Sequence, residues 1–128
     1  DEQLHDLPTD FPRINDDWTG RQNRYGYTGH SAGPFDEEPP FDGITKHDLQ
    51  AGTATTYHYG DQLVCGEPVF AADPDRSDED GGWILNHVHD LAADHTAVVV
   101  LDAATLEEVA QVHLPRRVPF GFHGSFLP

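Results

Sequence analysis

Residues 83–102 read Trp-Ile-Leu-Asn-His-Val-His-Asp-Leu-Ala-Ala-Asp-His-Thr-Ala-Val-Val-Val-Leu-Asp and carry the clearest structural signal in this 128-residue chain. Trp83–His89 and Thr96–Asp102 are rich in the β-branched and aromatic residues that favour strands. The tight connection Leu91–Asp94 between them leaves no room for a helix. This stretch therefore predicts two antiparallel strands that pair with each other.

The same pattern continues in both directions along the chain. Further strands are expected at Arg24–Thr28, Ile44–Leu49, Thr53–Tyr59, Glu67–Ala71 and Val109–Leu114. Gly52 separates the second and third of these strands and predicts a hairpin. Proline, glycine and acidic residues predict loops at Asp1–Asp17, Gly33–Gly43 and Asp73–Asp80. One helical turn is expected at Ala103–Glu107, and no segment predicts a long helix.

Short strands with turn signals every few residues define an all-β fold class. Propeller blades of four strands take roughly 40–50 residues each, so this chain has the length of two to three blades. Fewer than about four blades do not close around an axis. The same strand pattern also fits a small β-sandwich, so the pattern alone leaves both architectures open.

The charge balance is strongly acidic. The chain has 23 Asp and Glu residues against 7 Lys and Arg, which gives a formal net charge of −16. Such a field repels nucleic acids and anionic membranes, and dispersed carboxylates of this kind are typical of proteins that work in high salt. The acidic segment Asp73–Asp80 lacks the spacing of an EF-hand calcium loop, so we expect a solvated loop there.

Two further features narrow the class of protein. Ala97–Leu101 is the longest apolar run and is much shorter than the ~20 residues of a membrane-spanning helix. We therefore predict a soluble, cytoplasmic protein, with peripheral membrane association of a full-length form as an alternative. Cys65 is the only cysteine, which rules out a disulfide within the chain and favours a small buried side chain.

The C-terminal stretch Val118–Pro128 places one imidazole in an apolar, charge-free run. His123 lies there between Phe122 and Gly124, and a buried imidazole needs a partner because an unpaired polar group costs a few kcal/mol. Gly124 has no side chain, so a metal or another backbone can approach closely. A metal ligand and an ordinary core histidine are both consistent with this setting.

Several motifs occur in a fixed order along the chain. They are Asp10–Asn15, Arg24–Tyr27, Gly66–Phe70, Asp80–Leu85, Val99–Ala103, His113–Pro115 and Val118–Pro128. Together they resemble the C-terminal portion of the carotenoid cleavage oxygenase family, which includes apocarotenoid and lignostilbene dioxygenases. The resemblance covers nearly the whole chain, residues 1–128, and implies that the chain is the last part of a seven-bladed propeller domain and incomplete alone.

The resemblance also implies a metal centre. In this family four histidines from different blades hold a ferrous ion, and His123 matches the last of them. Glu67 matches a glutamate that orients that histidine through its outward ring nitrogen, an arrangement that fixes the tautomer. Asp10 stands where the family usually has another such glutamate, and it is one methylene shorter. Phe120, Phe122 and Phe126 are candidates to line a tunnel for a long apolar polyene, with packing beside the propeller axis as the alternative.

The implied activity is cleavage of a carbon–carbon double bond in a carotenoid, apocarotenoid or stilbene-like molecule by dioxygen, with Fe(2+) as cofactor and two carbonyl products. Three of the four iron ligands would lie outside this chain, so residues 1–128 alone are expected to be inactive. The missing N-terminal propeller portion is then an expected partner. One alternative is a truncated propeller fragment that serves as a structural or interaction module.

A second alternative is a small metalloprotein based on other histidines. His87 and His89 lie two residues apart on a predicted strand, so their side chains point to one face. This is a known metal-ligand spacing, yet no third ligand follows at a supporting position, which favours a packing role. The remaining histidines are expected to be structural or exposed, namely His5, His30, His47, His58, His95 and His113.

Overall fold

The computed structural model describes residues 6–33 and 41–127, and within these ranges the regular structure is almost entirely β. The strands are β1 Thr9–Arg13, β2 Tyr25–His30, β3 Gly43–Asp48, β4 Thr53–His58, β5 Leu63–Cys65, β6 Val69–Ala72, β7 Gly82–Asp90, β8 His95–Asp102 and β9 Glu108–His113. A single 3-10 turn, η1, spans Asp16–Trp18. The all-β prediction is confirmed.

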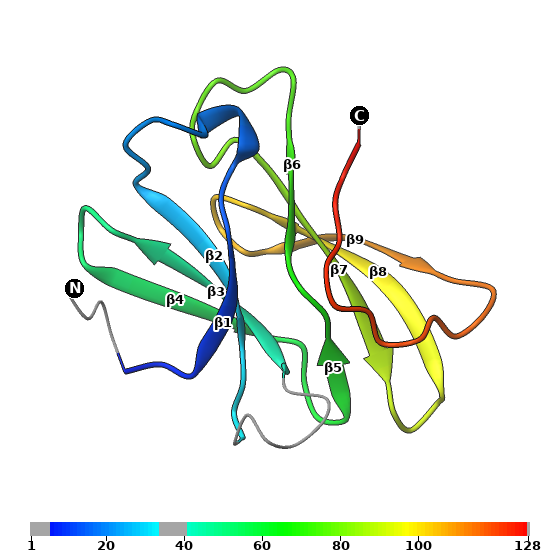
Figure 1. The fold of residues 1–128 in the computed structure, drawn as a ribbon. Helices are drawn as coiled ribbons and strands as arrows, with labels where there is room; N and C mark the ends of the chain where they lie inside the picture. The colour runs from blue at the N-terminus through cyan, green and yellow to red at the C-terminus, as the bar shows by residue number, and fades with distance from the viewer. Residues whose placement is uncertain (1–5, 34–40, 128) are drawn as a thin grey trace.

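The strands of the described ranges form two antiparallel sheets, which lie side by side in Figure 1. The first sheet has the order β1-β2-β3-β4, so each strand pairs with its neighbour in sequence. In the second sheet β7, β8 and β9 follow one another, while β5 and β6 both pair with β7 along different halves of its length. Each sheet is therefore a meander of the size expected for one propeller blade.

The two predicted hairpins are present with nearly the expected boundaries. Gly52 has a positive φ of 66° in the turn between β3 and β4, a conformation that glycine adopts without strain. The long hairpin of β7 and β8 keeps an unbroken register from Trp83 opposite Asp102 to Asp90 opposite His95. The residues that gave the strongest sequence signal thus form the most regular part of the fold.

The prediction of a loop throughout Asp1–Asp17 is wrong for β1, which pairs with β2. The register of this pairing shifts between Asp10 and Arg13, and Phe11 has a positive φ of 56°. Pro12 has no N–H to donate, so it is tolerated only on an edge strand or in a bulge. The irregular edge pairing explains why the sequence of β1 shows no alternation.

The expected helical turn at Ala103–Glu107 is present as a single turn, because Leu106 N donates to the carbonyl of Asp102, four residues earlier, at 2.8 Å. The segment is the loop of a hairpin, in which the Asp102 carboxylate accepts hydrogen bonds from the backbone N–H groups of Ala104 and Thr105 at 2.8 and 3.0 Å. Leu106 has a φ of 61°, so the turn does not continue as a helix. The backbone carbonyl and the side chain of Asp102 together close this single turn.

Side chains of the first sheet reach across to the second. The Tyr27 ring is fully buried 5.6 Å from the Phe70 ring, and its hydroxyl donates to the Ala103 carbonyl at 2.9 Å. Lys46 Nζ donates to an Asp80 carboxylate oxygen at 2.6 Å and to the Ala104 carbonyl at 2.8 Å. These contacts fix the two sheets against each other through both apolar and polar groups.

The acidic loop Asp73–Asp80 is only partly the solvated loop that was expected. Its middle is exposed, but Glu79 is buried and accepts hydrogen bonds from the backbone N–H groups of Arg24 and Tyr25 at 2.7 and 2.8 Å. These N–H groups lie at the start of β2. The Glu79 carboxylate accepts the hydrogen bonds that they would otherwise lack there. The end of the acidic loop is therefore part of the junction between the sheets.

Some sequence expectations concern residues outside the described ranges. They include His5, the middle of the predicted loop Gly33–Gly43, and Pro128. Among the residues that the structure describes, no helix has the length and apolar character needed to cross a bilayer.

Candidate metal centre at the C-terminal segment

After β9 the chain turns back across the second sheet as an extended segment without regular structure. Leu114 N donates to the Thr96 carbonyl at 3.0 Å, and Val118 N donates to the Thr96 hydroxyl at 3.0 Å. Prolines at 115 and 119 favour this extended path. The segment thereby carries residues 120–127 from the outer edge of the sheet back towards the first sheet, as Figure 1 shows.

Glu67 lies in the gap between β5 and β6, where the inner edge of the second sheet is interrupted. Gly66 remains hydrogen-bonded to β7. Its N–H donates to the His87 carbonyl at 3.1 Å, and its carbonyl accepts from the side-chain amide of Asn86 at 3.1 Å. Pro68 follows and restricts Glu67 to an extended backbone. The interruption therefore gives the Glu67 side chain a defined direction away from the sheet.

Three groups surround the Glu67 carboxylate, whose side chain is only 7% exposed. Oε2 accepts a hydrogen bond from Gly124 N at 2.8 Å, and Oε1 lies 3.3 Å from His123 Nδ1 and 3.3 Å from Arg13 Nε. A buried carboxylate needs such partners, because the loss of hydration is otherwise uncompensated. The structure thus brings together Glu67 and His123, the two residues that the family resemblance paired.

The His123 ring is fixed on its sides by aromatic neighbours. Its centroid lies 5.4 Å from that of Phe11 and 5.3 Å from that of Phe122, both in edge-to-face arrangements. The side chain is nevertheless 68% exposed in this chain. Nδ1 lies 3.3 Å from the Glu67 carboxylate, so the tautomer that is protonated on Nδ1 can donate a hydrogen bond to Oε1.

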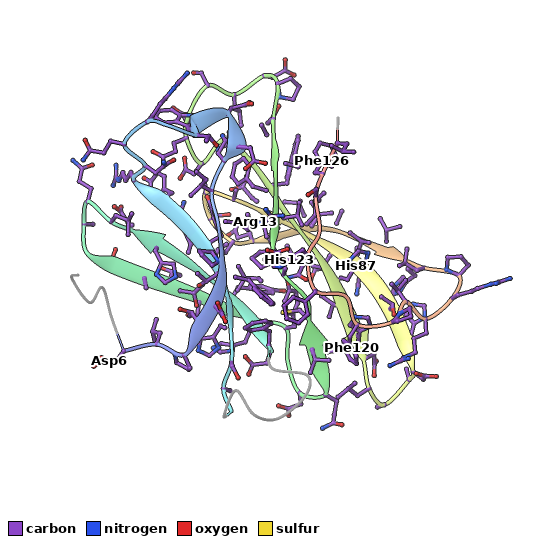
Figure 2. The ribbon with its side chains drawn as sticks, in the orientation of Figure 1. Asp6, Arg13, His87, Phe120, His123 and Phe126 are labelled. Carbon is purple, nitrogen blue, oxygen red and sulfur yellow. The ribbon has the colours of Figure 1, made fainter. Side chains whose placement is uncertain are left out.

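Arg13 is a site residue that the sequence reasoning did not select. Besides its ion pair with Glu67, its Nη2 donates to the Gly124 carbonyl. Arg13 belongs to β1, so it joins the first sheet to both the interrupted strand and the C-terminal segment. Figure 2 shows Arg13 and His123 near each other between the two sheets. The signal available in sequence was its place in the motif Asp10–Asn15.

Asp10 is not among the neighbours of His123. Its side chain is exposed, and its Oδ1 accepts a hydrogen bond from the adjacent Phe11 N at 2.7 Å. It lines a separate groove of about 540 Å³ that also contacts Thr28 and His47. The expected role of Asp10 towards a histidine from another segment stays a prediction.

A groove of about 340 Å³ runs beside the Glu67–His123 pair, and its walls are mostly apolar. Phe122 and Phe126 both line it, which fits their selection as candidate substrate contacts. Phe120 does not line it, because its ring packs on His89 with a centroid separation of 4.3 Å. The three phenylalanines therefore have different surroundings despite their close spacing.

His87 and His89 share one face of β7, as the alternation predicted, and both line the same groove. His89 is buried, with Nδ1 at 3.1 Å from the Thr96 hydroxyl, whereas His87 is exposed. Burial lowers the pKa of His89 below its usual value, with a smaller contribution from the positive charge of Arg117. His89 is thus a buried, hydrogen-bonded packing residue.

Another histidine group has metal-ligand geometry. His30, Asp42 and His58 place one donor atom each within 4.8 Å of one another, and within the described ranges this is the group of three that meets such a criterion. The sequence reasoning had assigned both histidines to structural or exposed roles. The remaining described histidines fit those roles: His47 Nε2 lies 2.8 Å from the Thr28 hydroxyl, and the half-buried His95 and the exposed His113 have ring nitrogens 3.0 Å apart.

Comparison with known proteins shows the family. The model of the family described as "RPE65: Retinal pigment epithelial membrane protein" matches residues 1–128, and the chain therefore belongs to this family of carotenoid cleavage oxygenases. It is 42% identical over 127 residues to 9-cis-epoxycarotenoid dioxygenase NCED1 of Oryza sativa subsp. japonica, covering 92% of this chain and 19% of that protein. It is 36% identical over 129 residues to the carotenoid cleavage oxygenase of Mycobacterium tuberculosis, covering 96% and 25%.

Solved structures show the same relationship. Cobalt-substituted Synechocystis ACO superimposes with a TM-score of 0.86 at 29% identity, covering 95% of this chain and 26% of that one. The D477G ACO/RPE65 chimera gives a TM-score of 0.87 at 28% identity, with coverage of 97% and 26%. The chain thus spans about a quarter of these proteins, and its two sheets form part of a propeller, as the sequence predicted.

Proposed function

We propose that this chain supplies one imidazole ligand, His123, to the Fe(II) centre of a dioxygenase that cleaves a carbon–carbon double bond in a carotenoid, apocarotenoid or stilbene-like molecule. The observation that supports it most directly is the contact between His123 Nδ1 and the buried Glu67 carboxylate at 3.3 Å. This contact leaves Nε2 as the metal-binding atom. The names of the relatives, which are carotenoid dioxygenases and oxygenases, support the reaction class.

The neighbouring residues have distinct tasks in this proposal. Glu67 holds the proton on Nδ1 and so keeps the imidazole in one tautomer and orientation. Arg13 balances the charge of Glu67 and, through Gly124, fixes the backbone next to the ligand. Phe11 and Phe122 limit rotation of the ring from its two sides. When bound, ferrous iron supplies the redox chemistry that cleavage by dioxygen requires.

The donor set fits one corner of such a centre rather than a whole centre. His123 is one ligand, and the resemblance implies three more histidines. Asp10 would orient one of those histidines, directly or through a water because of its shorter side chain. The chain covers 19–26% of the relatives described above, which agrees with ligands supplied by other segments. We therefore expect residues 1–128 alone to hold no stoichiometric iron and to cleave no polyene.

The substrate proposal follows from the groove beside His123. Its apolar walls, including Phe122 and Phe126, suit a long hydrocarbon rather than a charged molecule. The strongly acidic net charge of −16 likewise disfavours anionic substrates. An apolar polyene or stilbene-like molecule and dioxygen are the reactants that these properties support.

The test uses the full-length protein that carries this chain. His123→Ala is expected to remove bound iron, measured by mass spectrometry of the metal, and to abolish the loss of polyene absorbance during turnover. Glu67→Gln is expected to weaken iron binding by roughly 10–100-fold, because outer partners of a ligand typically have effects of that size. His87→Ala, which removes an exposed imidazole outside the Glu67–His123 pair, is the matched control for the iron measurement and should leave the bound iron unchanged.

The outcomes separate the alternatives. Iron that persists in His123→Ala but disappears in His87→Ala would refute the proposal and select a small metalloprotein based on β7. A full-length wild-type protein without iron or cleavage would instead select a structural or interaction module.

A further inference from the structure

A second histidine group lies at one end of the first sheet. His30 is the last residue of β2 and His58 the last residue of β4, and both are paired in register with Gly43, the first residue of β3. Residues directly opposite each other in antiparallel strands point to the same face. The side chains of His30 and His58 therefore lie on one face of the sheet. Gly43, which has no side chain, lies between them.

The glycine explains how the two rings can meet. The outer two of three adjacent strands are roughly 10 Å apart, which is too far for two imidazoles to touch across an ordinary side chain. Over Gly43 their ring centroids come to 4.8 Å in an edge-to-face arrangement. A Cβ at Gly43 would lie only 3.3 Å from His58 Nδ1 and would collide with the Tyr57 carbonyl oxygen. The approach of the rings thus depends on this position being glycine.

Asp42 completes the group from the adjacent position. Its backbone is fixed on both sides, because its N–H donates to the His30 carbonyl at 2.9 Å and its carbonyl accepts from Tyr59 N at 3.1 Å. One carboxylate oxygen, Oδ1, then lies 3.0 Å from His30 Nδ1 and 3.9 Å from His58 Nδ1. Three ligating atoms from three neighbouring segments therefore converge on one point.

We propose that His30, Asp42 and His58 bind a divalent transition metal of the zinc class. Ligand atoms around tetrahedral zinc are roughly 3.3 Å apart, given zinc–ligand bonds of about 2.0–2.1 Å, and the observed separations of 3.0 and 3.9 Å bracket that value. Two imidazoles and a carboxylate are ligands that suit zinc. The metal would take the place of the contact between His30 Nδ1 and Asp42 Oδ1.

Exposure decides what kind of site this is. The His30 side chain is 10% exposed and the His58 side chain 53%, so one flank is closed by protein and the other faces solvent. Water can therefore fill the fourth coordination position. The bound metal would tie the ends of β2, β3 and β4 together. The site shares no residue with the Glu67–His123 pair, so this proposal does not depend on the proposed function.

The experiment is a titration of the metal-stripped purified protein with Zn²⁺ by calorimetry, with Co²⁺ as a spectroscopic substitute. The wild type is expected to show one Zn²⁺ equivalent that is weakened more than about tenfold in His58→Ala and in Asp42→Asn. His58 is an exposed strand end, so its substitution should leave the fold intact, as circular dichroism can verify. His87→Ala is the matched control for loss of an exposed imidazole.

His123→Ala distinguishes this site from the candidate iron centre. Zn²⁺ binding that survives His123→Ala but fails in His58→Ala and Asp42→Asn supports the proposal, as does a Co²⁺ visible absorption band with the same dependence. Unchanged Zn²⁺ binding in His58→Ala and Asp42→Asn would overturn it. So would Zn²⁺ binding that is lost only with His123→Ala, since the metal would then belong to the other centre.

Discussion

The ion pair between Arg13 and Glu67 allows a quantitative test of how the C-terminal segment is held. The perturbation is a double-mutant cycle of Arg13→Ala, Glu67→Ala and the combined variant. Glu67 is 7% exposed and Arg13 27%, so the pair is largely shielded from water. Removing one partner from a buried pair typically destabilises a protein by about 3–5 kcal/mol, because the other charge stays buried without compensation.

The two single variants are expected to differ in the size of this loss in the free energy of unfolding. Glu67→Ala removes the acceptor for Gly124 N as well as the partner of Arg13, and we expect a loss of about 3–5 kcal/mol in the free energy of unfolding. Arg13 is more exposed, so Arg13→Ala should cost about 3 kcal/mol, the lower end of the range. Because the pair is in direct contact, the two losses should not add, and their coupling should be about 1–3 kcal/mol.

Urea unfolding followed by tryptophan fluorescence measures each corner of the cycle, provided that fluorescence and circular dichroism give coincident transitions. A coupling energy below about 0.5 kcal/mol would show that the two charges act independently. In that case Glu67 would not depend on Arg13 for charge compensation, and the reasoning about the site would be wrong.

Two further predictions concern the core and the effect of pH. Tyr27→Phe should destabilise the protein by about 1–3 kcal/mol, because the buried Ala103 carbonyl loses its 2.9 Å hydrogen bond. The control is Tyr57→Phe, which removes a hydroxyl that contacts Glu108 at the surface and should change stability much less in the same urea assay. The pKa of His89 is lowered in the folded state, so the unfolded state binds the proton more readily and stability should fall as the pH drops below about 6.5. His89→Gln should flatten this part of the pH profile, and an unchanged slope would contradict the assignment of the effect to His89.

Local sequence patterns were sufficient for the strands that alternate or carry β-branched residues. The β7–β8 hairpin is the clearest case, since its residues favour strands and its turn is short. Strand β1 was missed because Pro12 and the bulge at Phe11 erase the alternation that identifies a strand. The single turn at Ala103–Glu107 was predicted, but the Asp102 carboxylate that helps to close it was not, because propensity does not encode that side-chain contact.

The candidate site depends on contacts that no local pattern contains. Glu67 and His123 are 56 positions apart, and only the resemblance to a known family indicated that they meet. Arg13 was missed because its partners lie on other elements of the fold. The group of His30, Asp42 and His58 requires the register of three strands, and a one-residue slip in either pairing would separate the two rings.

The interruption between β5 and β6 has a consequence for the order of events during synthesis. Arg13 and Glu67 are synthesised well before residues 123 and 124. During synthesis the Glu67 carboxylate can therefore contact Arg13 before it can contact His123 and Gly124. The orientation of the His123 ring therefore depends on contacts with two segments that lie far from it in the sequence, β1 and the link between β5 and β6.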